Sequence, residues 1–365
     1  MSLDISSGWH LIEKQVGRKK VPTLLYYIPK HPTFNTKIAA FDFVNTLIWS
    51  DRGDYTVRGA ENWVWRSETL PNFLCELIGD EWTIAVFSNY ISKNLEELEN
   101  RVNQVRKDIQ TICPNGDIFF FASLISDENQ KPNTGMWDTF TEIWEQLTEE
   151  EFIPHENSFY VGDRAGDPKA EDPMFRKGHV EVSKEELTKL ELPLETSLGD
   201  DSLFAARIGL NFLLPSELPN QPEPDFPETQ EIIIMVGQQG SGKTTWALRI
   251  AEDLAYDLIA SEAAPLEGAY IIKDKKKRLR VIEELLRNGK SVIVDATHPS
   301  RESRAEVIRI AEKYNIPVRI FWVSRPGRSY NELRPKPVPE IALRTYTKKF
   351  ERPSIEEGAE IIRLV

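Results

Sequence analysis

Residues 231–246 read EIIIMVGQQGSGKTTW, and this stretch decides the fold of the C-terminal part of the chain. The run Glu231–Val236 is apolar and largely β-branched, a pattern typical of a strand buried on both faces. It leads directly into the pattern GxxxxGK[ST], and an amphipathic helix pattern follows. This order of strand, loop and helix predicts a nucleotide site, because backbone N–H groups can then surround phosphates at the helix N-terminus.

The glycine-rich loop also predicts the cofactors. We expect Lys243 to reach the β and γ phosphates of ATP and Thr244 to ligate Mg²⁺. The predicted ATP-binding residues are Gly237, Gly240, Ser241, Gly242, Lys243, Thr244 and Thr245. ATP and Mg²⁺ are therefore the cofactors that the sequence implies.

Two more apolar runs, 291–294 and 318–323, predict further strands of a parallel sheet. Asp295 directly follows the first run, on the edge where ligands bind in doubly wound sheets. Asp295 could hold Mg²⁺ through water or orient an acceptor. The alternative is that it caps the helix expected to begin near Ser300.

Cations surround Asp274 in the segment 271–278, which reads IIKDKKKR. Asp274 could act as a general base on an acceptor hydroxyl, with neighbouring cations binding the acceptor's phosphate. The alternative is a solvated basic helix start that Asp274 caps. The Pro-rich loop 325–339 carries further cations, among them Arg334, and is either a lid over the transferred phosphoryl group or an exposed loop.

The N-terminal half shows a second set of buried strands that end in polar residues. The strand pattern 37–43 contains Asp42 near its end, Ser88 follows the pattern 83–87, and Asp163 follows the pattern 158–161. Lys131 lies between the last two strands. Strands that alternate with helical patterns predict a second α/β domain. Two acidic strand ends, a hydroxyl and a lysine are the parts of a phosphoryl-transfer site with an aspartyl nucleophile and Mg²⁺.

Length and composition divide the chain in two. At 365 residues it is long enough for two domains. The stretch 215–230 contains five prolines and reads as a semi-rigid linker. The predicted domains are therefore residues 1–217 and 230–365, joined by a linker at 218–229.

The net charge of −13 is unevenly distributed. From Glu231 onward there are 24 Lys and Arg against 19 Asp and Glu, a net charge of +5, so the preceding part carries −18. The acidity argues against non-specific binding of polyanions by the whole chain, but not by its C-terminal part.

No apolar run is as long as a membrane span, and the N-terminus has no signal-peptide pattern. Two cysteines cannot form a disulfide framework. We expect a soluble, intracellular protein.

The C-terminal motifs resemble those of the 5′-hydroxyl polynucleotide kinases of phage and animal repair enzymes. The likeness rests on the glycine-rich loop at 237–244 (the P-loop), on KD at 273–274, on VDATHP at 294–299 and on the tail 338–358. It implies that Asp274 is the general base on the 5′-hydroxyl, and Arg334 the lid arginine. The acceptor-binding residues that it implies are Lys277, Arg278, Asp295 and Thr297. That family has Asn where His298 stands.

The N-terminal motifs resemble those of haloacid-dehalogenase-type phosphatases, and more closely the 3′-phosphatase half of the animal-type repair enzyme. The specific matches are KPNTGMWD at 131–138 and YVGDRAGD at 160–167, and the segment 201–210 also fits. The resemblance implies the following roles: Asp42 as nucleophile, Ser88 and Lys131 as phosphate ligands, Asp42, Asp163 and the Val44 carbonyl as Mg²⁺ ligands, and Asp167 as support for the metal site. It covers nearly the whole chain in the same domain order, with no phosphopeptide-binding module expected before it.

One position departs from the phosphatase pattern. The family reads DxDGT, whereas residues 42–46 here read DFVNT. The second aspartate of that motif protonates the leaving 3′ oxygen and then activates water, and Val44 cannot transfer a proton. General acid–base catalysis is worth roughly 10²–10⁴-fold. The sequence therefore predicts a phosphatase that turns over slowly or stalls as a phosphoenzyme.

The sequence as a whole predicts an α/β protein with a haloacid-dehalogenase-like doubly wound sheet followed by a P-loop NTPase-type parallel sheet. The predicted function is transfer of the ATP γ-phosphate to 5′-hydroxyl ends of DNA or RNA, with a weak 3′-phosphatase-type domain. Nucleic-acid ends are the expected partners, with no membrane involved. The alternative is a small-molecule kinase, acting on nucleosides or metabolites, that is fused to a pseudo-phosphatase scaffold.

Overall fold

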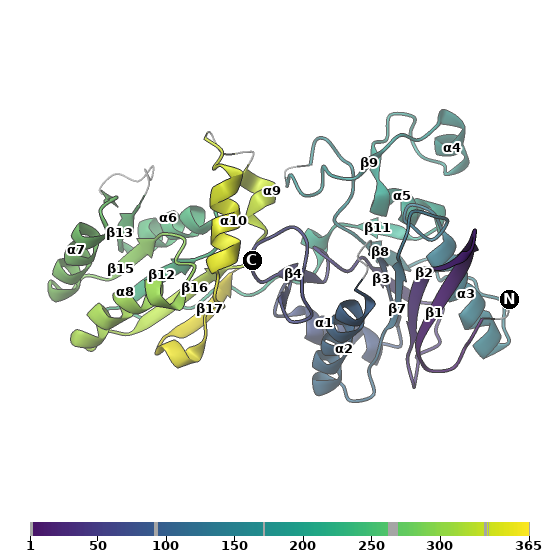
Figure 1. Ribbon diagram of the computed structural model, residues 1–365, viewed down its shortest axis with the longest axis horizontal. Helices are drawn as coiled ribbons and strands as arrows, with labels where there is room; N and C mark the ends of the chain where they lie inside the picture. Colours follow the sequence, from purple (N-terminus) through teal and green to yellow (C-terminus); the bar gives the residue numbers. More distant parts are fainter. Residues whose placement is uncertain are drawn as a thin grey trace. The chain divides into compact units, whose positions relative to one another are not determined.

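A computed structural model places the chain in two compact units (Figure 1). The residues that it describes are 3–90, 94–170, 172–261, 269–331, 334 and 336–364. The first unit comprises Met1–Ile48, Gly59–Glu61 and Trp65–Asn220, and the second comprises Trp49–Arg58, Asn62–Val64 and Gln221–Val365. Each unit is built on a largely or wholly parallel sheet with helices, which confirms the predicted fold class.

The first unit contains a seven-stranded sheet in the order β1-β2-β7-β6-β3-β8-β11. The five strands from β7 to β11 run parallel, and the hairpin β1–β2 pairs antiparallel with β7. The strands are β1 (Gly8–Val16), β2 (Lys19–Ile28), β3 (Ile38–Phe41), β6 (Thr83–Asn89), β7 (Phe119–Ser123), β8 (Phe159–Val161) and β11 (Asn211–Leu213). The helices are α1 (Leu70–Gly79), α2 (Leu95–Ile112), α3 (Gly135–Thr148), α4 (Lys184–Lys189), α5 (Asp200–Arg207) and η1 (Pro215–Glu217). Two small strand pairs complete the N-terminal half: β4 (Ile48–Ser50) with β5 (Trp63–Trp65), and β9 (His179–Val180) with β10 (Leu198–Gly199).

Aromatic side chains make up much of the first core. Phe119 and Phe121 of β7 lie on one face of the sheet and pack against Phe140 of α3, because alternate residues of a strand point to the same face. Phe120 packs instead against Phe43, with ring centroids 5.2 Å apart. This contact fixes the residue that follows Asp42.

The second unit contains a six-stranded parallel sheet in the order β14-β13-β15-β12-β16-β17. The strands are β12 (Ile232–Val236), β13 (Asp257–Ala260), β14 (Tyr270–Ile271), β15 (Val292–Asp295), β16 (Val318–Val323) and β17 (Glu360–Leu364). The helices are α6 (Lys243–Leu254), α7 (Lys275–Arg287), α8 (Arg301–Lys313), α9 (Gly327–Asn331), α10 (Glu340–Lys349) and η2 (Ile355–Glu357).

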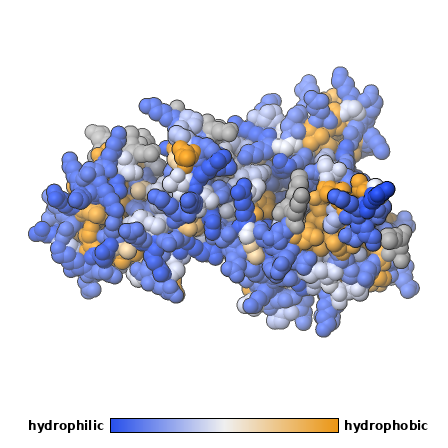
Figure 2. Space-filling model, viewed as in Figure 1, coloured by the Kyte–Doolittle hydropathy of each residue, from blue (hydrophilic) through white to orange (hydrophobic). Residues whose placement is uncertain are grey.

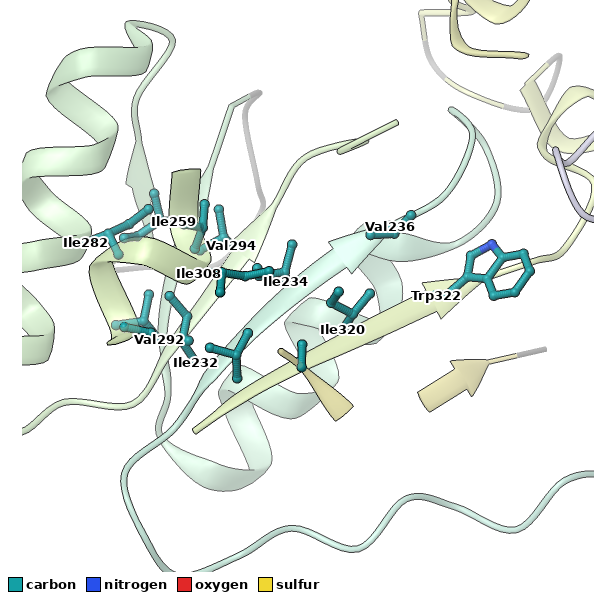
Figure 3. Close-up of a cluster of buried hydrophobic side chains, with 14 of the residues drawn as sticks. Ile232, Ile234, Val236, Ile259, Ile282, Val292, Val294, Ile308, Ile320 and Trp322 are labelled. Atoms are coloured by element: carbon teal, nitrogen blue, oxygen red, sulfur yellow. The ribbon is translucent and has the colours of Figure 1, made fainter. Parts of the chain in front are cut away.

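Helices cover both faces of the second sheet. Ile232 and Ile234 of β12 pack with Ile282 of α7 and Ile308 of α8 on one face (Figure 3). The intervening residues of β12, Ile233 and Met235, pack on the other face against α6. A strand that is buried on both faces reads as a continuous apolar run, which is why 231–236 was recognisable in the sequence.

The predicted linker runs along the second unit. Phe226 packs on its core, Gln221 Nε2 donates a hydrogen bond of 2.6 Å to the Arg363 carbonyl, and the Asp225 carbonyl accepts one of 2.7 Å from Arg319. Trp49 and Val64, which come from the N-terminal half of the sequence, also belong to a core cluster of this unit. Neither attachment was expected from the sequence.

A disulfide joins Cys75 of α1 to Cys113, the residue after α2. It is a single bridge between two neighbouring helices.

The visible surface is mostly hydrophilic, with apolar side chains in separate patches (Figure 2). Within the described part of the chain, every helix is too short or too polar to cross a bilayer.

A buried ion pair lies at the start of β12. The Arg319 guanidinium on β16 donates two hydrogen bonds to the Glu231 carboxylate, one of them 2.5 Å long, and Tyr256 donates a third of 2.9 Å. Glu231 is 1% exposed and Arg319 is 5% exposed. A buried charge that loses its partner is far less stable than the intact pair.

We therefore expect Glu231→Ala to lower the free energy of opening of β12 and β16 by about 3–5 kcal/mol, because the buried Arg319 cation loses its carboxylate partner. Hydrogen exchange of the full chain, followed by mass spectrometry at the amides of both strands, measures this. Glu223→Ala is the matched control, since that glutamate pairs with Arg249 at an exposed position. Equal protection of β12 in both variants would show that the pair contributes nothing to this sheet.

Candidate active sites

The carboxyl ends of two neighbouring parallel strands carry the first candidate site. Asp42 follows β3, and Asp163 lies two residues after the end of β8, the strand paired with β3. Ser88 lies in β6, which pairs with β3 on its other side, and is 4% exposed. Parallel strands bring their carboxyl ends to one edge of the sheet, so residues from three distant segments meet there.

Lys131 is the centre of this site. Its Nζ donates hydrogen bonds of 2.6 Å to Asp42 Oδ1 and 2.6 Å to Asp201 Oδ1, and lies 2.7 Å from the Tyr160 hydroxyl. Lys131 is 4% exposed. Burial by itself would lower the pKa of Lys131, but the two carboxylates outweigh burial and raise it, so the side chain is a cation.

Asp201 is the site residue to which the sequence analysis gave no role. It is fully buried at the start of α5 and accepts hydrogen bonds from Tyr160 (2.9 Å) and from the Arg164 backbone N–H (3.0 Å), besides that from Lys131. The family match at 201–210 is the signal in the sequence that points to Asp201. Asp167, which was expected to support the metal site, is exposed and accepts a hydrogen bond from the Lys169 backbone N–H instead.

Three buried carboxylates of this site could hold a divalent cation. One oxygen from each of Asp42, Asp163 and Asp201 lies within 4.8 Å of the others. Burial raises the pKa of Asp42 to about 6, although the Lys131 cation lowers it. Carboxylate oxygens gathered this closely are ligands that Mg²⁺ accepts. The donor set therefore fits the predicted ion.

The loop after Asp42 contains the departure from the family motif. Val44 is half-buried and makes an isolated bridge to Ile48. Asn45 has a φ of 72°, a conformation that Asn adopts more readily than most residues, and it replaces the glycine of the motif. The loop thus keeps its turn, while position 44 has no group that could transfer a proton.

The second candidate site is the P-loop of the second unit. Gly237, Gly240 and Gly242 all have positive φ, between 86° and 153°, which lets backbone N–H groups turn towards a common centre. Lys243 Nζ donates a hydrogen bond of 2.6 Å to the Gln238 carbonyl. The Ser241 hydroxyl is buried without a hydrogen-bond partner among the described residues. These features suit a bound triphosphate.

Thr244 and Asp295 meet at this loop. The Thr244 hydroxyl donates a hydrogen bond of 2.7 Å to Asp295 Oδ2. The cap of α8 is Ser300, whose hydroxyl accepts from the Ser303 N–H, so Asp295 does not cap that helix. A hydroxyl beside a carboxylate at the P-loop is a ligand set that Mg²⁺ accepts.

Asp274 is the N-cap of α7. Its Oδ1 accepts a hydrogen bond of 2.7 Å from the Lys277 backbone N–H, and the residue is exposed. Arg278 Nη1 donates to the Ile272 carbonyl at 3.1 Å. The cap uses one carboxylate oxygen and leaves Oδ2 to take a proton, so capping and base catalysis are compatible.

A cavity of about 390 Å³ opens beside the P-loop. Its wall includes Gln239 of the loop and Thr297, the predicted acceptor ligand. The other lining residues are Pro299, Ile341, Ala342, Thr345, Tyr346 and Lys349. The cavity is thus bounded by the nucleotide loop on one side and by α10 on another, which suits an acceptor nucleoside.

The start of α9 packs closely on the P-loop. A Cβ on Gly240 would lie 2.3 Å from the Gly327 carbonyl oxygen, so only glycine fits there. Asn331 at the end of α9 bonds both the N–H and the carbonyl of Val338, which closes the loop that carries the half-buried Arg334. Glu332, Leu333 and Pro335 of the predicted lid lie outside the described residues.

Comparisons with known proteins support both halves of this description. Residues 37–218 match the family model "Polynucleotide kinase 3 phosphatase", and residues 232–353 match the model "AAA domain". A bifunctional polynucleotide phosphatase/kinase of Schizosaccharomyces pombe is 28% identical over 88% of this chain and 78% of its own length. The chain belongs to the family of bifunctional polynucleotide phosphatase/kinases.

A putative bifunctional polynucleotide phosphatase/kinase of Acanthamoeba polyphaga mimivirus is 26% identical over 90% of this chain and 84% of its own length. Family membership confirms the resemblance that the sequence motifs indicated. It also favours the polynucleotide kinase over the alternative of a small-molecule kinase with a pseudo-phosphatase scaffold.

We expect Asp201→Asn to weaken Mn²⁺ binding at the first site by about 10–100-fold, because residues that orient metal ligands have effects of this size. Electron paramagnetic resonance titration of the ATP-free full chain measures the affinity. Asp200→Asn is the control: Asp200 is the adjacent residue, but it pairs with Arg164 outside the carboxylate group. Loss of affinity in both variants, or in neither, would contradict a specific role for Asp201.

Proposed function

We propose that the second unit transfers the ATP γ-phosphoryl group to a 5′-hydroxyl end of DNA or RNA, and that residues 230–365 form this kinase domain. The hydrogen bond between Thr244 and Asp295 carries the proposal, because it joins the P-loop to the strand end that precedes Thr297 and the acceptor cavity.

In the proposed reaction the acceptor lies against Thr297 with its phosphate near Lys277 and Arg278. Asp274 Oδ2 takes the proton of the 5′-hydroxyl while the oxygen of that hydroxyl attacks the γ phosphorus. ADP leaves with the electrons of the broken P–O bond. Lys243 and Arg334 stabilise the charge on the transferring group. Mg²⁺, ligated by Thr244, would neutralise charge on the phosphates.

We propose further that residues 1–217 form a 3′-phosphatase-type domain with little turnover. In this proposal Asp42 attacks the phosphorus of a 3′-phosphate and forms an aspartyl phosphate, and the 3′ oxygen leaves as the hydroxyl after taking a proton. Ser88 and Lys131 would hold the phosphate, and Asp42, Asp163 and the Val44 carbonyl would hold Mg²⁺. Val44 cannot supply the proton for the leaving oxygen or activate the hydrolytic water, so both steps depend on solvent.

Asp274→Asn separates the two roles of Asp274. Asn is as good an N-cap as Asp, so α7 should keep its stability. It cannot take a proton, so transfer of γ-labelled phosphate to a 5′-hydroxyl oligonucleotide should fall by roughly 10²–10⁴-fold. Unchanged transfer would reduce Asp274 to a helix cap.

The acceptor class is tested in the same assay. Binding to a polynucleotide weakens steeply as salt rises, whereas binding of a nucleoside does not. We therefore expect the KM for an oligonucleotide, but not that for a nucleoside, to depend on ionic strength. Labelling of nucleosides alone would favour the small-molecule kinase.

Val44→Asp should raise the rate of phosphate release from a 3′-phosphorylated oligonucleotide by roughly 10²–10⁴-fold, because it supplies the missing acid and base. Val44→Asn has a similar shape without a transferable proton and is the matched control. Asp42→Asn in the Val44→Asp background should remove the gain. If Val44→Asp releases phosphate no faster than Val44→Asn, position 44 does not limit turnover.

A further inference from the structure

The loop between β15 and α8 contains a strained residue. His298 has a φ of 37°, in the left-handed region that non-glycine residues rarely adopt, and it is 6% exposed. Such a conformation persists only where the surrounding contacts impose it. The preceding residue is Thr297, which we have placed in the acceptor site.

Two hydrogen bonds join this loop to the start of the P-loop. His298 Nδ1 donates to the Met235 carbonyl at 2.9 Å, and the Gly237 N–H donates to the Thr297 carbonyl at 3.3 Å. Burial lowers the pKa of His298 to about 4, and the charges of Arg278, Arg304 and Lys243 act in the same direction. The imidazole is therefore neutral at pH 7, and its single proton is on Nδ1.

A fully buried arginine holds the loop from the other side. Arg304 of α8 donates through Nη1 to the His298 carbonyl at 3.1 Å. Its Nε and Nη2 each donate to the Glu357 carboxylate at 2.7 Å, and both side chains are at most 2% exposed. Glu357 also accepts a hydrogen bond from the Ser354 N–H, which ties the C-terminal tail into the same network.

We propose that His298 and Arg304 are positioning residues that hold Thr297 in register with the P-loop, so that the acceptor hydroxyl and the γ-phosphate are aligned for transfer. The inference rests on the proposed kinase function. Neither side chain needs to touch either substrate for this role. Their contacts instead fix the distance between the backbone of the acceptor loop and that of the nucleotide loop.

Alignment of two substrates has a kinetic signature of its own. A misplacement of about 1 Å can reduce the rate of the chemical step by about 10²-fold, while each substrate still binds. A residue that only stabilises the fold would change thermal stability and both affinities as well. A residue with no role would change none of these quantities.

Variants of His298 test the proposal in the full chain. His298→Gly accepts the positive φ but lacks the donor, whereas His298→Asn accepts the positive φ and keeps an N–H near the position of Nδ1. We expect kcat for a 5′-hydroxyl oligonucleotide to fall by about 10–100-fold in His298→Gly and to stay within about threefold in His298→Asn. The dissociation constants of a non-hydrolysable ATP analogue and of the oligonucleotide should change by less than about threefold in both, as expected when alignment alone is lost.

Arg304→Lys provides a second test, since lysine keeps the charge but cannot bond Glu357 through two nitrogens and also reach the His298 carbonyl. Arg301→Lys is the matched control on the same helix, because Arg301 pairs with Glu356 at an exposed position. We expect a loss of kcat in Arg304→Lys only. Wild-type kcat in His298→Gly, or a fall in kcat that is matched by losses of melting temperature and of both affinities, would overturn the inference. Absence of transfer by the unaltered protein would instead refute the proposed function.

Discussion

Each of the two sheets is covered by helices, and this constraint determines where chemistry can take place. A polar side chain on a buried strand face is costly unless it is paired, as Arg319 is with Glu231, so most polar side chains gather where the strands end. In the first unit, β3 and β8 end near Asp42 and Asp163, and in the second, β12 ends at the P-loop and β15 at Asp295. The same physical rule thus produces two phosphoryl-transfer sites from unrelated sequences.

Charge balance distinguishes the two sites. In the first, Lys131 bridges the buried carboxylates of Asp42 and Asp201, and Asp163 adds a third carboxylate oxygen close enough to share a metal ion. In the second, glycine N–H groups and Lys243 provide positive potential for a polyanion, which is consistent with the basic composition of that part of the chain.

Two residues show how a family pattern tolerates change. Val44 offers no proton-transfer group, while the bridge to Ile48 and the positive φ of Asn45 keep the turn beside Asp42. His298 stands where the motif has asparagine, and its Nδ1 donates to the Met235 carbonyl.

The sequence by itself determined the α/β class, the P-loop and the order of the two halves, because buried parallel strands and glycine-rich loops leave local patterns. It did not reveal Asp201, the ion pair between Arg304 and Glu357, or the attachment of residues 221–229 to the second unit. Each of these depends on contacts between residues far apart in the chain, and a single buried Asp or Arg looks like a surface residue until its partner is known. The sequence left open whether Asp274 caps a helix. Only the tertiary structure decided this, and only it could show that Thr244 reaches Asp295, because both facts concern the direction of a side chain.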